Sequence, residues 1–183
     1  MYLIRGQNNL KLFKSRYPDI LLSGTIGNFD GLHLGHQAIL GKIKNNAQKY
    51  NAKTIVFFTE PHAAEYFSKV RDRNQIPPPR ICPWREKVQL LKKSKIDFAC
   101  FLKFNNKLRT MSPDDFISQI LDSINLVSFT VGDDFRFGAG RKGDTDLLKN
   151  WGEKKGILVE NTETITLDGQ RVSSTRIREE LLN

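Results

Sequence analysis

The sequence predicts an α/β fold: a Rossmann-like open parallel sheet with helices on both faces. Apolar runs suited to buried strands alternate with segments that carry one apolar helical stripe. The order of strand, glycine-rich loop, helix and strand over residues 19–58 is that of a βαβ unit, whose right-handed crossover pairs strands in parallel. The length of 183 residues, 39% of them hydrophobic, predicts one domain, 1–183.

Hydrophobic patterning predicts the elements of the first half of the chain. Residues 19–29 (DILLSGTIGNF) are expected to form a strand that runs into a loop, residues 36–50 a helix, and residues 53–58 a second strand. Residues 59–81 are polar and charged, contain three consecutive prolines and have no period long enough to bury a face. We therefore expect a long mobile loop there.

The second half of the chain continues the alternation. Ser112 is the predicted cap of one helix, and Asp168-Gly169 is the predicted turn of a hairpin. Helices are expected over 83–94, 113–124, 145–154 and 173–182, and strands over 97–104, 126–131 and 157–161. Ligands of open α/β sheets bind at the carboxyl ends of strands, so the loops after the strands are the candidate sites.

The chain is basic, with 29 lysines and arginines against 20 aspartates and glutamates and a net charge of +9. This charge attracts anions, and both polyphosphates and nucleic acid fit it. Cys82 and Cys100 are too few for a disulfide framework, so we expect a reducing compartment and two packing residues. No segment resembles a secretion signal or a membrane span, which predicts a cytoplasmic protein without a membrane partner.

The first candidate site is the decamer from Gly27 to His36, GNFDGLHLGH, which follows a strand and opens a helix. Free N–H groups and the positive end of the helix converge at such a position and favour a phosphate. Gly31 and Gly35 would let the backbone approach the anion, and His33 and His36 would project from the same side of the helix. The decamer is neither a Walker loop nor a dinucleotide fingerprint.

Two other interpretations of the histidines stay open. A zinc site needs a third ligand at matching spacing, and the only other histidine is His62. Alternatively, one histidine caps or packs while the other lies on the surface. The glycines and the position after a strand favour phosphate binding.

The second candidate site is Val131 to Asp144, VGDDFRFGAGRKGD, where a strand again runs into glycine, carboxylates and arginine. Carboxylates at a strand end bind hydroxyls, or Mg²⁺ through water. Adjacent side chains of a strand point to opposite faces, so only one of Asp133 and Asp134 is expected to face the site. Capping of a turn is the alternative.

The third candidate site, Val172 to Arg178 (VSSTRIR), places three hydroxyls at a helix start and arginines in its first two turns. This arrangement predicts a second anion site, with plain helix capping as the alternative. Two helix N-termini aimed at phosphates suit a triphosphate that is attacked at its α-phosphorus between them. No serine, cysteine or lysine is placed as a covalent nucleophile.

In this order and at these separations, GNFDGLHLGH, FFTEPH, VGDDFRFGAGRKGD and SSTRIR resemble the FMN adenylyltransferase module of prokaryotic bifunctional FAD synthetases, the riboflavin kinase/FMN adenylyltransferases. The resemblance covers about residues 3–182. It implies a HxGH-type nucleotidyltransferase fold and an enzyme that transfers the adenylyl group of ATP to the phosphate of FMN, giving FAD and pyrophosphate. ATP and FMN are then the expected small-molecule substrates, with Mg²⁺ as cofactor.

The resemblance also implies roles for individual residues. The groups expected to contact the phosphates of ATP in catalysis are His33, His36, Ser174, Thr175 and Arg178. The residues expected to bind nucleotide or flavin are Gly27, Asn28, Phe29, Asp30, Gly31 and Gly35 in the first motif, Phe58, Glu60, Pro61 and His62 in a flap, and Gly132, Asp133, Asp134, Phe135 and Phe137 in the second motif. No protein ligand of the metal is assigned.

This sequence departs from the family pattern in three places. Ala63 stands where the flap has a second proline, and Cys82 replaces a threonine in the segment 79–87, PRICPWREK. The family's riboflavin kinase domain is absent from this chain. We therefore expect the chain alone to adenylylate FMN and not to phosphorylate riboflavin.

Other functions stay open at this point. One is a HxGH nucleotidyltransferase with another acceptor, such as phosphopantetheine or nicotinate mononucleotide, and another is an inactive remnant that acts as a scaffold. A third is a basic nucleic-acid-binding domain, but the lysines scatter over helix faces instead of forming a stripe, so no nucleic-acid partner is expected. The sequence does not determine the oligomeric state.

Overall fold

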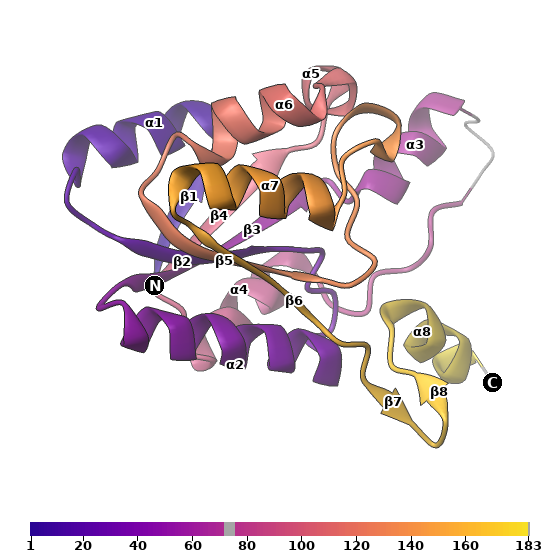
Figure 1. Ribbon diagram of the computed structural model, residues 1–183. Coiled ribbons are helices and arrows are strands. Elements are labelled where there is room, and N and C mark those ends of the chain that lie inside the picture. Colours follow the sequence, from indigo (N-terminus) through magenta and orange to yellow (C-terminus); the bar gives the residue numbers. More distant parts are fainter. Residues whose placement is uncertain (72–75, 183) are drawn as a thin grey trace.

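The computed structural model describes residues 1–71 and 76–182, and it contains a six-stranded sheet between layers of helices (Figure 1). The strands are β1 (Tyr2–Arg5), β2 (Leu22–Ile26), β3 (Lys53–Glu60), β4 (Phe98–Lys103), β5 (Leu126–Gly132) and β6 (Leu158–Thr162), with a separate hairpin of β7 (Thr166–Leu167) and β8 (Gln170–Arg171). The helices are α1 (Gly6–Arg16), α2 (Leu34–Lys49), α3 (Ala63–Arg71), α4 (Trp84–Lys93), α5 (Asn106–Thr110), α6 (Pro113–Phe116), α7 (Thr145–Lys155) and α8 (Ser174–Leu182), with a π-helix η1 (Ile117–Leu121) and a 3₁₀ turn η2 (Ala139–Arg141).

The strand order places the candidate site. The order is β1-β4-β3-β2-β5-β6, and every pair within this sheet is parallel. The chain proceeds from β2 to β3 and β4 on one side and later to β5 and β6 on the other, so the direction of winding reverses between β2 and β5. Ligands of open α/β sheets bind outside the carboxyl ends of the strands at such a reversal.

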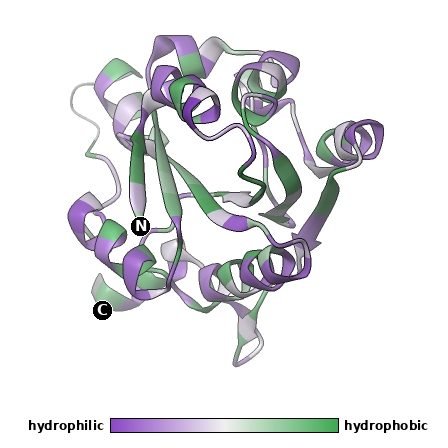
Figure 2. Cartoon of the chain, turned by 90° about the vertical axis from the view of Figure 1, so that its left-hand side faces the viewer, coloured by the Kyte–Doolittle hydropathy of each residue, from purple (hydrophilic) through white to green (hydrophobic). Residues whose placement is uncertain are grey.

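Two hydrophobic cores fill the space on the two faces of the sheet. The larger core holds Phe57 of β3 against apolar side chains of α1, α6 and α7, and the other holds its neighbour Phe58 against α2 and α4. Consecutive strand residues point to opposite faces, and this run of buried residues is typical of a strand covered on both sides. Figure 2 shows the mostly green strands lying between helices with purple outer faces.

The Rossmann-like α/β architecture predicted from the sequence is confirmed. The helices expected at 36–50, 83–94, 145–154 and 173–182 and the hairpin at Asp168-Gly169 are present with shifts of one or two residues at their ends. Ser112 caps α6, where its Oγ accepts a hydrogen bond from the Asp115 N–H at 3.0 Å. The helix expected over 113–124 continues from α6 into the π-helix η1.

Two expectations about less regular segments are corrected. Residues 63–71, expected to be mobile loop, form α3, because Tyr66 and Phe67 pack edge-on against Phe104, with ring centroids 5.3 and 5.8 Å away. Residues 59 and 60 of the expected loop belong to β3, residues 76–81 are irregular as expected, and residues 72–75 lie outside the described residues. No element was expected before residue 19, but β1 pairs with β4 and α1 buries Leu10 and Phe13. None of the helices within the described ranges has the length and apolar character needed to cross a membrane.

Candidate active site

The loop between β2 and α2 is held in a backbone path that requires glycine at one position. Gly31 has φ +80°, and a Cβ atom there would lie 2.6 Å from Cγ2 of Ile81. Phe29 and Leu32, also with positive φ, bury their side chains in the core below the loop, while Asn28 is exposed. The Gly27 N–H donates to the Phe57 carbonyl at 3.1 Å and so attaches the loop to β3. The loop is therefore fixed against the segment at 79–82.

His33 and His36 lie together at the start of α2, as the sequence predicted. His33 precedes the first helical residue, and its ring stacks on that of His36 with centroids 3.7 Å apart. Gly35 permits this position, since a Cβ atom there would approach the His33 ring to 3.2 Å. Phe29 packs on the other side of His36, with a centroid distance of 4.9 Å. The two imidazole rings are thus stacked on each other, and the ring of His36 packs against Phe29.

Both imidazoles are neutral near pH 7. Burial is the main cause that lowers the pKa of His36, to about 3, with smaller contributions from His33 and Lys87. Burial also lowers the pKa of His33. The Nδ1 atoms of both rings are buried and have no hydrogen-bond partner among the described residues. In the ligand-free protein, these rings can serve an anion as neutral hydrogen-bonding groups and not as permanent positive charges.

Asp30 joins three segments that are distant in the sequence. Its carboxylate is 4% exposed and accepts hydrogen bonds from the backbone N–H groups of Ile81 at 3.1 Å and Cys82 at 3.0 Å. It also accepts from Nη2 of Arg178 in α8 at 2.6 Å. Burial acts to raise the pKa of Asp30, but the two amides and the guanidinium outweigh it, so the pKa is lowered and the carboxylate stays ionised. Asp30 thus connects the loop before α2, the segment at 81–82 and α8.

The start of α8 lies beside the first loop through the same aspartate. Ser174 donates from Oγ to the Asp30 carbonyl at 3.1 Å, and Arg178 Nε donates to the Pro79 carbonyl at 2.7 Å. Thr175 is exposed on the outer side of this helix start. The structure therefore brings the first and third motifs together, and it pairs the charge of Arg178 with Asp30.

In the flap expected at 58–62, the structure divides the residues between the core and the site. Phe58 is 1% exposed and packs in the core beside the pocket, with its ring centroid 5.0 Å from Nζ of Lys87, so its expected contact with the ligand stays a prediction. Glu60 accepts from Nη2 of Arg80 at 2.7 Å, and Pro61 follows at the half-buried end of β3. Burial and the Lys87 ammonium lower the pKa of His62, whose Nδ1 accepts the Ala64 N–H at 3.1 Å.

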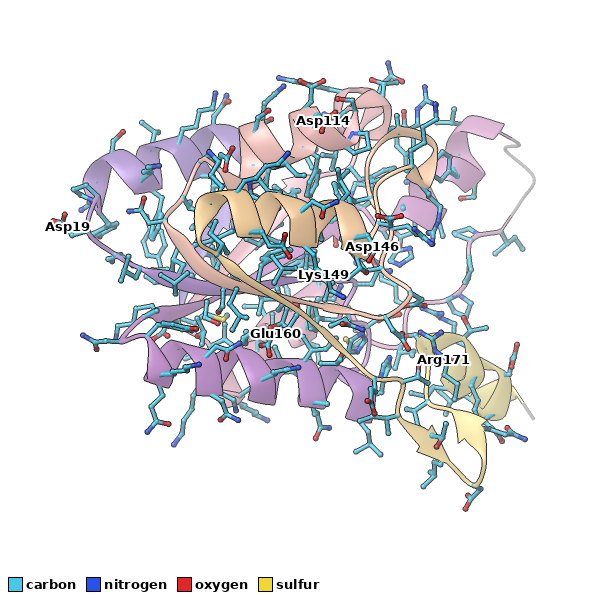
Figure 3. All side chains as sticks on the ribbon, viewed as in Figure 1. Asp19, Asp114, Asp146, Lys149, Glu160 and Arg171 are labelled. Atoms are coloured by element: carbon cyan, nitrogen blue, oxygen red, sulfur yellow. The ribbon has the colours of Figure 1, made fainter. Side chains whose placement is uncertain are left out.

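The second motif is tied to the hairpin of β7 and β8 through Arg171. Gly132 ends β5, and the exposed Asp134 accepts from Nη2 of Arg171 in β8 at 2.6 Å. Asp133 is also exposed, and its carboxylate accepts from Thr164 and lies 4.0 Å from the same arginine. Both carboxylates thus face the hairpin, and the expectation that they point to opposite sides is wrong, because β5 ends before them and the chain turns. Figure 3 shows Arg171 between the hairpin and this turn.

The aromatic residues of the second motif have different environments. Phe137 is buried in the larger core, and its backbone bridges to Gly143. Phe135 stacks on Phe137 with a centroid distance of 5.7 Å and an angle of 12°. Phe137 is therefore a packing residue in this conformation, while the half-buried Phe135 covers it at the edge of the site.

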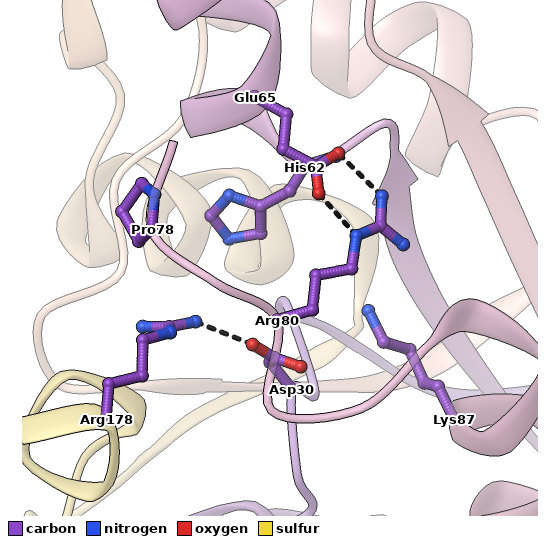
Figure 4. Close-up of a pocket in the computed structure, with 7 residues that line it drawn as sticks. All are labelled: Asp30, His62, Glu65, Pro78, Arg80, Lys87 and Arg178. Carbon is purple, nitrogen blue, oxygen red and sulfur yellow. Dashed lines mark hydrogen bonds and ion pairs between the residues drawn. The ribbon is translucent and has the colours of Figure 1, made fainter. Parts of the chain in front are cut away.

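A small pocket opens where the flap, the segment at 78–82 and α8 meet (Figure 4). Three predicted site residues line it, and the others lie in the surrounding loops or in the core. The lining residues are Asp30, His62, Glu65, Pro78, Arg80, Lys87 and Arg178. Sequence reasoning assigned no role to Glu65, Pro78, Arg80 or Lys87, although the segment PRICPWREK was part of the resemblance and signalled two of them.

An ionic network holds α3 beside this pocket. Arg80 bonds to both oxygens of Glu65 and to Glu60, so one guanidinium joins β3, α3 and the segment at 78–82. The Glu65 carboxylate also accepts the His62 N–H at 3.2 Å, at the start of α3. The side-chain hydrogen bond from Arg80 is the main cause that lowers the pKa of Glu65. Helix α3 is therefore held by ion pairs as well as by its aromatic contacts with Phe104.

The described part of the chain contains no cluster of metal ligands. Within residues 1–71 and 76–182, no group of three His, Cys, Asp or Glu side chains is placed to hold a metal ion. Both carboxylate oxygens of Asp30 already accept hydrogen bonds. The Cys82 thiol accepts the Gly31 N–H at 3.4 Å, and burial raises its pKa. These donors do not fit the zinc site considered from the sequence.

The fold and the site define a Rossmann-like α/β protein in which two helix starts meet at one edge of the parallel sheet. Residues 21–176 match the family described as FAD synthetase. The chain is 36% identical over 187 residues to a bifunctional riboflavin kinase/FMN adenylyltransferase of Haemophilus influenzae and 37% identical over 182 residues to that of Escherichia coli K12. The chain belongs to the FAD synthetase family.

The matches differ in how much of each protein they cover. The two relatives are matched over 100% and 99% of this chain, and the chain spans about half their length, 56% and 55%. Two solved structures share the fold: a macrolide-efflux protein from Streptococcus pneumoniae, with a TM-score of 0.81 and 21% identity, and a pantoate-beta-alanine ligase from Francisella tularensis, with 0.61 and 13%. The match to the efflux protein covers 100% of this chain and 58% of that protein's chain. The match to the ligase covers 97% of this chain and 72% of the ligase chain.

Proposed function

We propose that this chain transfers the adenylyl group of ATP to FMN, giving FAD and pyrophosphate. A phosphate oxygen of FMN attacks the α-phosphorus of ATP, a new P–O bond forms, and the bond to the pyrophosphate leaving group breaks. The observation that carries the proposal is the junction of the starts of α2 and α8 through Asp30, in a chain of the FAD synthetase family. Two helix N-termini at one place suit the phosphates of a nucleotide.

In this proposal, His33 and His36 donate neutral hydrogen bonds to the phosphates, and Ser174 and Thr175 bind them from the other side. Fixed donors aimed at the developing charge need no reorganisation during the reaction, so they lower the barrier. Packing against the ring of Phe29 keeps the ring of His36 in place. Positioning of FMN and ATP in line supplies the rest of the catalysis.

Mg²⁺ enters the proposal with the substrate. Mg²⁺ is commonly held by one or two carboxylates together with substrate phosphates and water, which agrees with a chain that presents no cluster of ligands in its described part. When bound, it would offset phosphate charge. We further propose that residues 1–183 form one adenylyltransferase domain that works in the cytoplasm.

The test is to incubate the purified chain with ATP, Mg²⁺ and FMN and to follow FAD and pyrophosphate by chromatography. Parallel reactions contain riboflavin, phosphopantetheine or nicotinate mononucleotide in place of FMN. We expect FAD and an equal amount of pyrophosphate from FMN alone. Absence of FAD, or adenylylation of another acceptor at a higher rate, would contradict the proposal.

A further inference from the structure

Lys87 is a buried cation that lines the pocket, and the proposed reaction assigns it no role. It lies in the first turn of α4, is 4% exposed, and places its Nζ 5.0 Å from the centroid of the Phe58 ring. It lines the pocket with Asp30 and Arg80 (Figure 4). Its charge is also unfavourable at this end of a helix, where the dipole is positive.

The other two cations that line the pocket are paired. Arg80 is bonded to Glu60 and Glu65, and Arg178 to Asp30. Within the described part of the chain, no carboxylate lies within ion-pair distance of the Lys87 ammonium. Burial lowers its pKa, and Asp30 is the main group that opposes this effect. A buried ammonium without a contacting anion is costly, so this position favours the arrival of an anion.

The surroundings of Lys87 indicate which anion it receives. The starts of α2 and α8 lie on one side of Asp30, and they are the elements proposed to hold the phosphates of ATP. Lys87 lies on α4, and the pocket that it lines is bounded by His62, Glu65 and Arg80 at the flap. The acceptor phosphate must reach the α-phosphorus of ATP from a different direction than the leaving pyrophosphate, so the flap side is the place for it.

We propose that Lys87 binds the phosphate group of FMN and thereby selects FMN over riboflavin, an inference that rests on the proposed FMN adenylylation. A lysine ammonium is a compact point charge with three donors, which suits a terminal phosphate. The apolar side of the Phe58 ring and the buried stem of the lysine hold the ammonium in place.

The test compares Lys87→Met with Lys92→Met, a matched removal of a lysine charge from an exposed position of the same helix. Dissociation constants for FMN and for riboflavin are measured by flavin fluorescence without ATP. We expect Lys87→Met to weaken FMN binding by about tenfold or more, as for the loss of a hydrogen bond to a charged group, and to leave riboflavin binding within about twofold. Lys92→Met should leave both unchanged.

Thermal unfolding separates binding from a structural role. Because Lys87→Met removes a buried, unpaired charge, its Tm should equal or exceed that of the wild type. An equal loss of affinity for both flavins, or unchanged FMN binding, would overturn the proposal, as would a wild type that does not bind FMN more tightly than riboflavin. The FAD assay is separate, so a wild type that distinguishes the two flavins but makes no FAD contradicts the proposed reaction and not the role of Lys87.

Discussion

At the scale of single residues, the candidate site differs from a surface of free positive charges. Its histidines are neutral, and Arg178 is already paired with a carboxylate. Asp30 takes up the charge of Arg178, and burial keeps His36 neutral. The phosphates would therefore meet oriented N–H and O–H groups around an anion site whose unpaired positive charge comes from Lys87. Oriented dipoles in a partly buried site have larger effects than the same groups in water.

Removal of the His36 ring is expected to slow the reaction. In His36→Ala, we expect kcat for FAD formation to fall on the order of a hundredfold or more, the effect typical of losing one donor to developing charge. Steady-state kinetics with FMN and ATP give the measurement, and Lys44→Ala is the control because Lys44 is exposed further along α2. A rate near that of the wild type would remove His36 from the proposed mechanism.

The neutral state of His36 also predicts acid sensitivity. The pKa of His36 is about 3 in the folded protein and near its ordinary 6.5 in the unfolded chain, so unfolding takes up a proton between these values. The free energy of unfolding therefore decreases as the pH falls through 6.5. Between about pH 7 and about pH 5, the wild type should lose roughly 2 kcal/mol more than His36→Gln. Urea unfolding at both pH values measures this, and equal losses would show that His36 titrates normally.

Asp30 is expected to contribute strongly to stability. Asp30→Asn leaves the partly buried Arg178 without its counter-ion, and because the loss of one member of a fully buried pair costs about 3 to 5 kcal/mol, we expect a loss near the lower end of this range. Asp134→Asn removes a hydrogen bond to Arg171 at an exposed position, where the cost should be about 1 kcal/mol or less. Chemical denaturation of both variants tests the contrast. Similar losses of stability in the two variants would mean that Asp30 does not hold these segments together.

At the scale of elements, α3 and α8 are attached to the sheet by side chains and not by backbone pairing. The segments before these helices carry the flap and the third motif, and both helices are short. Arg80 and the aromatic contacts with Phe104 hold α3, whereas Asp30 holds α8. Such elements open more easily than the central strands, because few buried contacts resist their local unfolding.

Arg80→Met is expected to loosen α3 selectively. The change removes the ion pairs with Glu60 and Glu65 but keeps an unbranched apolar side chain in place of the methylene stem of Arg80. We expect faster amide hydrogen exchange in α3, by about threefold to tenfold, and unchanged exchange in β2 and β5. Arg136→Met, which removes an exposed ion pair with Asp144, is the matched control. Unchanged exchange in α3 would show that its aromatic packing alone holds it.

At the scale of the whole molecule, the parallel sheet gathers the carboxyl ends of its strands at one edge, and the chain carries a net charge of +9. The reversal between β2 and β5 separates the loops that follow these strands and leaves room between them. The excess positive charge attracts anionic substrates to the molecule in general. In the proposed function, the oriented groups at the edge then select among these anions.

The charge alone is not expected to make this a nucleic-acid-binding protein. We expect binding to random duplex DNA at about 0.15 M salt to be weaker than about 1 μM, as for non-specific contacts between a basic surface and phosphates. Fluorescence anisotropy over a salt series measures it, with ATP as competitor. Tight, saturable binding that ATP does not displace would favour the nucleic-acid alternative.

The sequence by itself determined the α/β class, most of the helices and strands, and the three motifs at the loops that follow strands and open helices. These features depend on local periodicity and on spacing within about twenty residues, which a single chain displays directly. It left α3 unrecognised because the contacts that stabilise it come from Phe104, far along the chain.

Only the tertiary structure decided what the individual site residues contact. It placed Phe58 and Phe137 in the cores and paired Asp30 with Arg178 across 148 positions of sequence. It also placed Lys87 in a pocket without an ion-pair partner among residues 1–71 and 76–182. Burial, which sets the protonation of His36, is likewise a property of the packed chain. The physical reason is that charge pairing and desolvation depend on distances in space, and local sequence patterns do not fix those distances.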